Sequence, residues 1–240
     1  MTQLLIATNN KGKIEELQDL LKDTGIDPVT PAQINLELDV IEDGLTYTEN
    51  ATKKALAFAL ASGLISLADD SGLEVDALSG APGLYSARYG SPNGGKLSDG
   101  ERRKYLISKL LDKPHPWTAR FKATIAIAVP FNNVTLNRAT LAPRSGRKST
   151  RTRRPGASAD EGLLLSRNEK VHLFEGTCEG EIIPEERGTG GFGYDPIFLF
   201  PELGKTMAEL SRDEKNRLSH RARAVMKARI FLNNLPSNVG

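Results

Sequence analysis

The sequence predicts a mixed α/β fold, in which helices flank one long sheet. Three observations predict it. Strand-like and helix-like segments alternate in the first half of the chain, strand signals dominate the middle, and the C-terminal region has apolar residues at helical spacing. A chain of 240 residues, 39% of them hydrophobic, can bury a substantial core in one large domain or two small ones.

The first predicted element is a buried strand at residues 3–7, and a polar turn at residues 8–12 connects it to a helix. The apolar residues of that helix recur at a spacing that places them on one face. They are Ile14, Leu17, Leu20 and Leu21. Gly25 lies where a C-terminal cap belongs, so we expect the helix to end there.

The second predicted helix has start and stop signals of its own. Thr46 and Glu49 have the spacing of a capping box, in which a hydroxyl and a carboxylate each accept a hydrogen bond from a free amide. A run rich in Ala and Leu follows at residues 51–61, and Gly63 is placed to end the helix.

A third helix is expected after the capping box formed by Ser98 and Glu101. Two strand-like runs follow, at residues 120–129 and 170–183. Sequential strands often pair, so these two runs predict a hairpin. The segment between them, at about residues 131–168, then becomes an enlarged hairpin tip, which costs the fold little because loop-closure entropy grows slowly with length.

This segment carries most of the excess positive charge of the chain. It contains seven basic residues and no acidic residue from position 131 to position 159. The seven are Arg138, Arg144, Arg147, Lys148, Arg151, Arg153 and Arg154. Without them, the remaining 25 basic and 30 acidic residues would turn the net charge from +2 to −5. A flexible solvated loop is the favoured interpretation, and a nucleic-acid-binding segment is the alternative.

The polar turn after the first strand is a candidate phosphate site, because a helix N-terminus offers free amides and a partial positive charge. Lysine side chains there add full charges, and Thr and Asn add hydrogen-bond donors. The candidate residues are Thr8, Asn9, Asn10, Lys11, Gly12 and Lys13. The turn does not match the P-loop pattern, and an ordinary strand-to-helix turn is the competing interpretation.

Residues 64–68 predict a short buried strand that ends at Asp69, Asp70 and Ser71. In open α/β sheets, ligands bind at this edge. Side chains alternate along an extended chain, so one acid should face the cleft while the other is structural. The competing interpretation is a turn with an Asx cap.

Two adjacent carboxylates repel one another unless a cation lies between them and a partner. A carboxylate site that handles phosphate suggests Mg²⁺, which prefers a few carboxylates together with phosphate oxygens and water. Glu42 and Asp43, in the acidic stretch before the second helix, could supply a further ligand.

A glycine-rich stretch at residues 188–196 is the third candidate site. Its glycines let the backbone approach a ligand closely, and Phe192 and Tyr194 could stack on a planar base. An ordinary glycine-rich turn is the competing interpretation.

Further along the chain, Lys215, His220 and Arg221 lie near possible helix starts. Ser211 and Ser219 are both possible N-caps. If the helix breaks at Ser219, His220 and Arg221 lie in a first turn and can face an anion. If one helix runs through, Lys215 and Arg221 point in different directions and cannot share a site. The sequence leaves both possibilities open.

Composition excludes several classes of protein. The longest apolar runs are far shorter than the roughly 18 residues that a membrane span requires, and the N-terminus lacks the pattern of a secretory signal. A single cysteine, Cys178, rules out a disulfide framework. We therefore expect a soluble, cytoplasmic protein that does not associate with membranes.

Taken together, the motifs resemble those of the inosine triphosphate pyrophosphatase family, whose members hydrolyse non-standard purine nucleoside triphosphates to the monophosphate and pyrophosphate. The matching segments occur in family order and cover nearly everything except about residues 131–168. They are residues 7–13, 46–51, 68–73, 80–83 with 86–89, 188–198 and 219–221.

The resemblance implies a role for each candidate residue. Residues 8–13 would grip the triphosphate, with Asn10 and Lys13 as the firmest matches. Asp70 would bind Mg²⁺ and act as the base that activates water, Glu42 would be the second metal carboxylate, and Ser71 would contact the substrate. The residues that would hold the base and the sugar-phosphate are Phe192, Gly193, Tyr194, Asp195, Lys215, His220 and Arg221.

The same resemblance implies an elongated mixed sheet with flanking helices, two lobes around a central cleft, and a homodimer. It also implies one domain over residues 1–240 that hydrolyses inosine, deoxyinosine and xanthosine triphosphates (ITP, dITP and XTP). Two alternatives are a nucleic-acid-binding protein that acts through the Arg-rich segment and a septum-inhibitor-type nucleotide pyrophosphatase with a different base preference.

Overall fold

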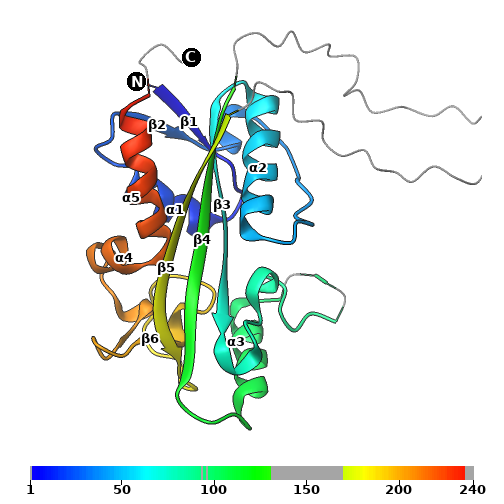
Figure 1. The fold of residues 1–240 in the computed structure, drawn as a ribbon, viewed down its shortest axis with the longest axis vertical. Coiled ribbons are helices and arrows are strands. Elements are labelled where there is room, and N and C mark those ends of the chain that lie inside the picture. Colours follow the sequence, from blue (N-terminus) through cyan, green and yellow to red (C-terminus); the bar gives the residue numbers. More distant parts are fainter. Residues whose placement is uncertain (1, 93, 96, 131–169, 236–240) are drawn as a thin grey trace, which may run out of the picture.

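The computed structural model describes residues 2–92, 94–95, 97–130 and 170–235, and over this part of the chain the strands form one seven-stranded mixed sheet. The strand order is β2-β1-β3-β4-β5-β6-β7. The long strands of this sheet run along the long axis of the molecule (Figure 1). The basic segment at residues 131–168 lies outside the described residues.

Strand β1 (Thr2–Ile6) pairs in parallel with both β2 (Ile26–Val29) and β3 (Ile65–Val75). The prediction that the third strand ends at Asp69 is wrong, because β3 continues to Val75. Its pairing with β1 stops at Leu67, but β4 remains hydrogen-bonded to it as far as Val75. Asp69 and Asp70 therefore lie within a strand, just beyond the end of its parallel neighbour.

The hairpin prediction is confirmed. Strands β4 (Trp117–Val129) and β5 (Lys170–Ile182) pair in antiparallel register along their whole length, from Trp117 opposite Ile182 to Val129 opposite Lys170. Two short strands, β6 (Phe198–Phe200) and β7 (Lys205–Thr206), complete the sheet at one end.

Five α-helices flank the sheet in the described part of the chain, as predicted for an α/β fold. They are α1 (Lys11–Leu20), α2 (Tyr47–Ser62), α3 (Asp99–Leu110), α4 (Arg212–Leu218) and α5 (His220–Asn233). Short 3₁₀ turns lie at Ala32–Ile34, Asp76–Leu78, Gly83–Tyr85, Asp195–Ile197 and Met207–Glu209.

Helices α1 and α5 cover one face of the sheet and α2 covers the other, while α3 packs at the far end (Figure 1). A core of residues from α1, α5 and the sheet lies on the first face, with Leu17 and Val225 fully buried. A second core lies at the far end, where Leu106 and Leu110 of α3 pack with Trp117. This arrangement gives the elongated, two-lobed form that was expected.

The helix ends follow the predicted caps with two corrections. Thr46 accepts a hydrogen bond from the amide of Glu49 at 3.1 Å, but the Glu49 carboxylate accepts from the amide of Leu45 rather than from that of Thr46. The expectation that α1 ends at Gly25 is wrong, because α1 ends at Leu20. The Thr24 hydroxyl donates to the carbonyl of Leu21 at 2.6 Å, and this bond satisfies one of the free carbonyls that end the helix.

Other expected caps are present. Gly63 caps α2 with a φ of 73°, a conformation that suits glycine. Ser98 and Glu101 form a complete capping box at α3. In the part of the chain that the structure describes, no helix combines the length and apolarity that crossing a membrane requires.

Candidate active site

The turn between β1 and α1 is organised by its own polar side chains. Asn10 caps α1, its side-chain oxygen accepting from the amide of Lys13 at 3.2 Å, and the Thr8 hydroxyl accepts from the amide of Asn10 at the same distance. The Lys13 side chain turns inward, and its Nζ lies 3.2 Å from the carbonyl oxygen of Asp69. Burial lowers the pKa of Lys13, although the Asp69 carboxylate opposes that shift.

The two adjacent acids of β3 point to opposite faces of the sheet, as their alternation predicted. Asp69 is fully buried and accepts from Nε of Arg221 at 2.6 Å. Burial alone would raise the pKa of Asp69, but Arg221 and Lys13 beside it hold that pKa well below its usual range. Asp69 is therefore a structural carboxylate that holds the charged side chains of Arg221 and Lys13 in place.

Asp70 lies on the other face and lines a cavity. One of its oxygens accepts from the amide of Ser71 at 3.1 Å, while the buried Oδ2 has no hydrogen-bond partner among the described residues. Burial raises the pKa of Asp70, and the nearby Lys13 and Lys54 oppose that shift. A buried carboxylate oxygen without a partner is costly unless something else binds it.

Glu42 reaches the same cavity from the loop before α2. Its Oε1 lies 2.9 Å from Nζ of Lys54, and this lysine also donates to the carbonyl oxygen of Asp69 at 3.2 Å. Asp43, the neighbouring candidate, is turned away to an exposed ion pair with Lys53. The structure therefore favours Glu42 over Asp43 as the carboxylate that accompanies Asp70.

The C-terminal helix breaks at Ser219, so the alternative of one continuous helix is wrong. Ser211 caps α4 and Ser219 caps α5. The break brings Lys215 and Arg221 onto one carboxylate, that of Glu16 in α1, with Nζ of Lys215 at 2.6 Å.

His220, in the first turn of α5, stacks on Phe121 with ring centroids 4.7 Å apart. Burial, with the nearby charge of Arg221, lowers the pKa of His220 to about 3, so this side chain is neutral at physiological pH.

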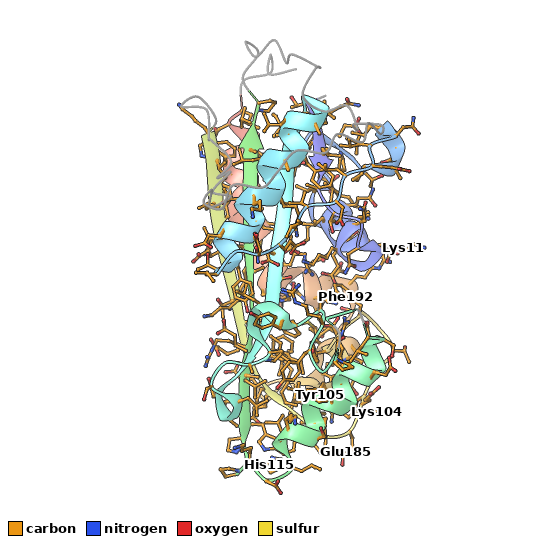
Figure 2. All side chains as sticks on the ribbon, turned by 90° about the vertical axis from the view of Figure 1, so that its right-hand side faces the viewer. Lys11, Lys104, Tyr105, His115, Glu185 and Phe192 are labelled. Carbon is orange, nitrogen blue, oxygen red and sulfur yellow. The ribbon has the colours of Figure 1, made fainter. Side chains whose placement is uncertain are left out.

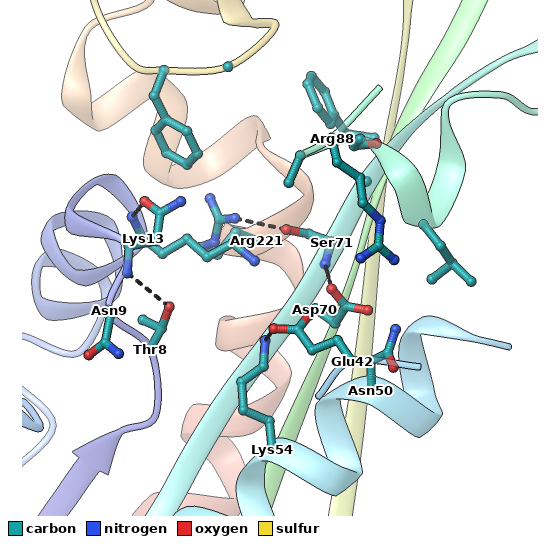
Figure 3. A pocket seen from close by; sticks show the side chains of 18 of the residues that line it. Thr8, Asn9, Lys13, Glu42, Asn50, Lys54, Asp70, Ser71, Arg88 and Arg221 are labelled. Atoms are coloured by element: carbon teal, nitrogen blue, oxygen red, sulfur yellow. Dashed lines mark hydrogen bonds and ion pairs between the residues drawn. The ribbon is translucent and has the colours of Figure 1, made fainter. Parts of the chain in front are cut away.

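A cavity of about 660 Å³ collects nearly all of these side chains. The predicted site residues that line it are Thr8, Asn9, Asn10, Lys13, Glu42, Asp70, Ser71, Phe192, Gly193, Tyr194, Asp195, Lys215, His220 and Arg221. Figure 3 shows Lys13 on one side of this cavity and Asp70 with Glu42 on the other. The structure thus brings together residues from the start, middle and end of the chain.

Two predicted site residues do not line the cavity. Lys11 is exposed on the outside of the turn (Figure 2). Gly12 faces the ring of Phe192, and a Cβ at this position would lie 2.5 Å from Cδ1 of that ring. Gly12 therefore makes room for Phe192 to lie against the turn, which is an indirect role in the site.

Sequence reasoning missed several residues that line the cavity, among them Asn50, Lys54 and Arg88. Asn50 and Lys54 are four residues apart on α2 and so share a face, which was an available signal. Arg88 lies in a matched motif, and Figure 3 shows its guanidinium pointing toward Asp70 and Asn50. The segment before Arg88 folds back onto β3, where Pro82 bridges to Glu74, and no local pattern predicts this contact.

The fold and the cavity define an α/β protein with a cleft lined by charged side chains between two lobes. A model of the Ham1 family matches residues 4–231. The chain therefore belongs to the Ham1 family.

Individual relatives agree with this assignment. The chain is 43% identical to the dITP/XTP pyrophosphatase of Desulforamulus reducens over 97% of this chain and 96% of that protein. It is 42% identical to the dITP/XTP pyrophosphatase of Gloeobacter violaceus, over 95% of this chain and 92% of that one. The solved structure of a HAM1 protein from Coxiella burnetii has a TM-score of 0.72 at 33% identity, covering 98% of this chain and all of that chain.

Proposed function

We propose that this protein hydrolyses non-standard purine nucleoside triphosphates, namely ITP, dITP and XTP, to the monophosphate and pyrophosphate. The observation that carries this proposal is that Lys13 of α1 and Asp70 of β3 line one cavity. Relatives that match nearly the whole chain are named dITP/XTP pyrophosphatases. Those names favour this activity over the septum-inhibitor type with its different base preference.

The donor set fits Mg²⁺. Asp70 offers a buried oxygen without a partner, and Glu42 offers a second carboxylate at the same cavity. Among the described residues no group of three or more His, Cys, Asp or Glu side chains could hold a metal by itself. A site with two carboxylates suits Mg²⁺, which completes its shell with phosphate oxygens and water. When bound, Mg²⁺ would offset the negative charge that develops on the phosphate oxygens.

The side chains of this protein supply the other requirements of the reaction. Asp70 has a raised pKa and accepts a proton from the water whose oxygen bonds to a phosphorus of the α–β linkage. As that P–O bond forms, the bridging P–O bond between the α- and β-phosphates breaks, and the monophosphate and pyrophosphate are released. Lys13 and Lys54 lie on either side of the Asp69 carbonyl, where their charges offset those of the phosphate oxygens.

Base selection would depend on hydrogen-bond donors that line the cavity. Hypoxanthine and xanthine carry a 6-oxo group where adenine carries a 6-amino group, so a hydrogen-bond donor there favours the first two. His220 is neutral and can donate from one ring nitrogen. Arg221 already donates to Asp69, Glu16 and Ser71, which leaves His220 and backbone amides as the better candidates.

A panel of nucleoside triphosphates tests the proposed function. We expect pyrophosphate release from ITP, dITP and XTP in the presence of Mg²⁺, little release from ATP, and loss of activity when the metal is chelated. Quantification of pyrophosphate and of the nucleoside monophosphate checks this result. Release of inorganic phosphate in place of pyrophosphate, or activity that survives chelation, would contradict the proposal.

Replacement of Lys13 by Ala should raise the KM for ITP by about tenfold, because a charged hydrogen bond to phosphate is lost. Binding of inosine, which has no phosphate, should change much less. The matched control is Lys11→Ala, two residues away and outside the cavity, with an expected change below about twofold. Equal losses for ITP and inosine would argue against a phosphate contact at Lys13.

The pH profile should show one acid limb, caused by Asp70. Burial raises the pKa of Asp70, so activity should be lost as pH falls, at a pH above the usual carboxyl value of about 4. His220 has a pKa of about 3 and should add no limb between about pH 5 and pH 8. The profile of kcat/KM for His220→Gln should keep its acid limb where the wild type has it, and a displaced limb would contradict this assignment.

We also propose that the protein is a cytoplasmic homodimer, as the family resemblance implies. Sedimentation equilibrium would detect the dimer.

A further inference from the structure

The first turns of α3 hold the glycine-rich loop at one residue, Gly193. The amide of Gly193 donates to Oδ2 of Asp99 at 2.5 Å, and its carbonyl accepts from Nη1 of Arg103 at 2.7 Å. Both polar groups of this residue are therefore bound by side chains of a helix some ninety positions earlier in the chain.

Each of the two α3 side chains is itself held in place. Arg103 donates through Nη2 to Glu186 at 2.8 Å, and its side chain is only 14% exposed. Asp99 is paired through its other oxygen with Arg102, which also donates to the carbonyl of Ala87 at 2.6 Å. The rotamers of Asp99 and Arg103 are thus fixed before any ligand binds.

Asp99 and Arg103 together form a clamp on Gly193, and this clamp determines the directions of the adjacent side chains of Phe192 and Tyr194. Gly193 has a φ of 63°, and Phe192 and Tyr194 diverge from it on either side. Tyr194 donates through its hydroxyl to the carbonyl of Ser86 at 2.9 Å. The Phe192 ring lies against Gly12 and has Nζ of Lys215 5.6 Å from its centroid. A shift of the loop would move Phe192 away from Gly12 in the first turn of α1.

The clamp also limits what the loop backbone can do. Because the amide and the carbonyl of Gly193 are bound to Asp99 and Arg103, they are occupied within the protein. Recognition by this part of the loop then comes from the side chain of Phe192, because Tyr194 is 3% exposed and its hydroxyl donates to Ser86. Such a contact is only as selective as the loop is rigid.

We propose that Asp99 and Arg103 are positioning residues for base selection: they fix Gly193 so that the Phe192 ring presents one geometry to the purine. This inference rests on the proposed function. It assigns to the start of α3 a role in selectivity that is separate from the phosphate chemistry at Lys13 and Asp70.

The test compares Asp99→Ala with Asp213→Ala. Asp213 is a fitting control because it too is an acid in the first turn of a helix with a Ser–Glu capping box, and it contacts no cavity residue through its side chain in the described structure. We expect Asp99→Ala to raise the KM for ITP about tenfold and to lower the ratio of kcat/KM for ITP to that for ATP about tenfold, with kcat nearly unchanged. Asp213→Ala should match the wild type.

A second variant and a double mutant sharpen the test. Arg103→Ala should show the same pattern as Asp99→Ala, and the double variant should lose less than the product of the two effects, because both residues hold Gly193. Glu186→Gln weakens the Arg103–Glu186 ion pair but leaves the bond from Arg103 to Gly193 in place. It should therefore change the ratio of kcat/KM for ITP to that for ATP less than Arg103→Ala does. If Asp99→Ala fails to fold, Arg103→Ala takes its place, because it removes the bond to the carbonyl of Gly193.

Hydrogen exchange supplies a readout that is independent of activity. The amides of residues 188–195 should exchange faster in Asp99→Ala than in Asp213→Ala. The inference would be overturned if Asp99→Ala left both the ITP-to-ATP ratio of kcat/KM and the rate of amide hydrogen exchange unchanged. A fall in kcat at constant KM would also overturn it. Failure of the wild type to release pyrophosphate from any triphosphate would instead contradict the proposed function, and the exchange measurement would still decide whether the clamp exists.

Discussion

Replacement of Asp70 by Asn is expected to reduce kcat for pyrophosphate release by about a thousandfold or more, because it removes the proton acceptor and one charge of the metal site together. The amide has nearly the same shape as the carboxylate, so the cavity should keep its form. Steady-state assays with ITP at saturating Mg²⁺ would measure the loss. Near-wild-type turnover in this variant would reject Asp70 as the base.

The stability of the same variant provides its control. The pKa of Asp70 is raised in the folded protein, so its contribution to stability is fully present below the pKa of the unfolded chain and is lost as pH rises through the folded pKa. At neutral pH the ionised Asp70 therefore opposes folding. Asp70→Asn should be at least as stable as the wild type in urea at pH 7, and a marked destabilisation would mean that the loss of activity reflects misfolding.

Replacement of the adjacent Asp69 by Asn should, unlike Asp70→Asn, cause a large loss in the free energy of unfolding. This side chain is fully buried and bonds Arg221, whose own side chain is 3% exposed. Removing one partner leaves a buried charge with fewer contacts, at a cost of about 3 kcal/mol in the free energy of unfolding. Urea unfolding at pH 7 would measure it, with Asp43→Asn, in an exposed pair with Lys53, as the matched control that should change by less than about 1 kcal/mol.

The pH dependence of this contribution also differs from that of Asp70. The pKa of Asp69 is lowered in the folded state, so its stabilisation is present above the unfolded value of about 3.9 and is lost as pH falls through the folded pKa. The difference in the free energy of unfolding between the wild type and Asp69→Asn should therefore become smaller at acidic pH. Equal stability of Asp69→Asn and Asp43→Asn at pH 7 would contradict the structural role of Asp69.

The order of the elements was predictable because their local signals are strong. Capping residues marked the start of α2 and α3, and period-two alternation marked β4. The length of β3 was not predictable, because the residues around Asp69 have low strand propensity and only the pairing with β4 keeps them extended. The end of α1 depended on a side-chain hydrogen bond from Thr24 that no periodic pattern signals.

The site was predictable to the extent that its residues cluster in short motifs. The break at Ser219 could not be decided, since both serines are good N-caps and the choice depends on Arg221 reaching Asp69 across the fold. Lys54 shares a helix face with Asn50, but only the packing of α2 on the sheet shows that this face borders the cavity. The place of Arg88 in the cavity likewise results from tertiary packing.

The guanidinium of Arg221 joins α5 to both Glu16 and Asp69, residues that precede it by 205 and 152 positions. During synthesis, the two acids therefore leave the ribosome long before the cation that neutralises them. The nascent chain must be almost complete before the wall of the cavity can close. Chains that terminate before residue 221 should accumulate as unstable products without nucleotide-hydrolysing activity, even though they contain both Lys13 and Asp70.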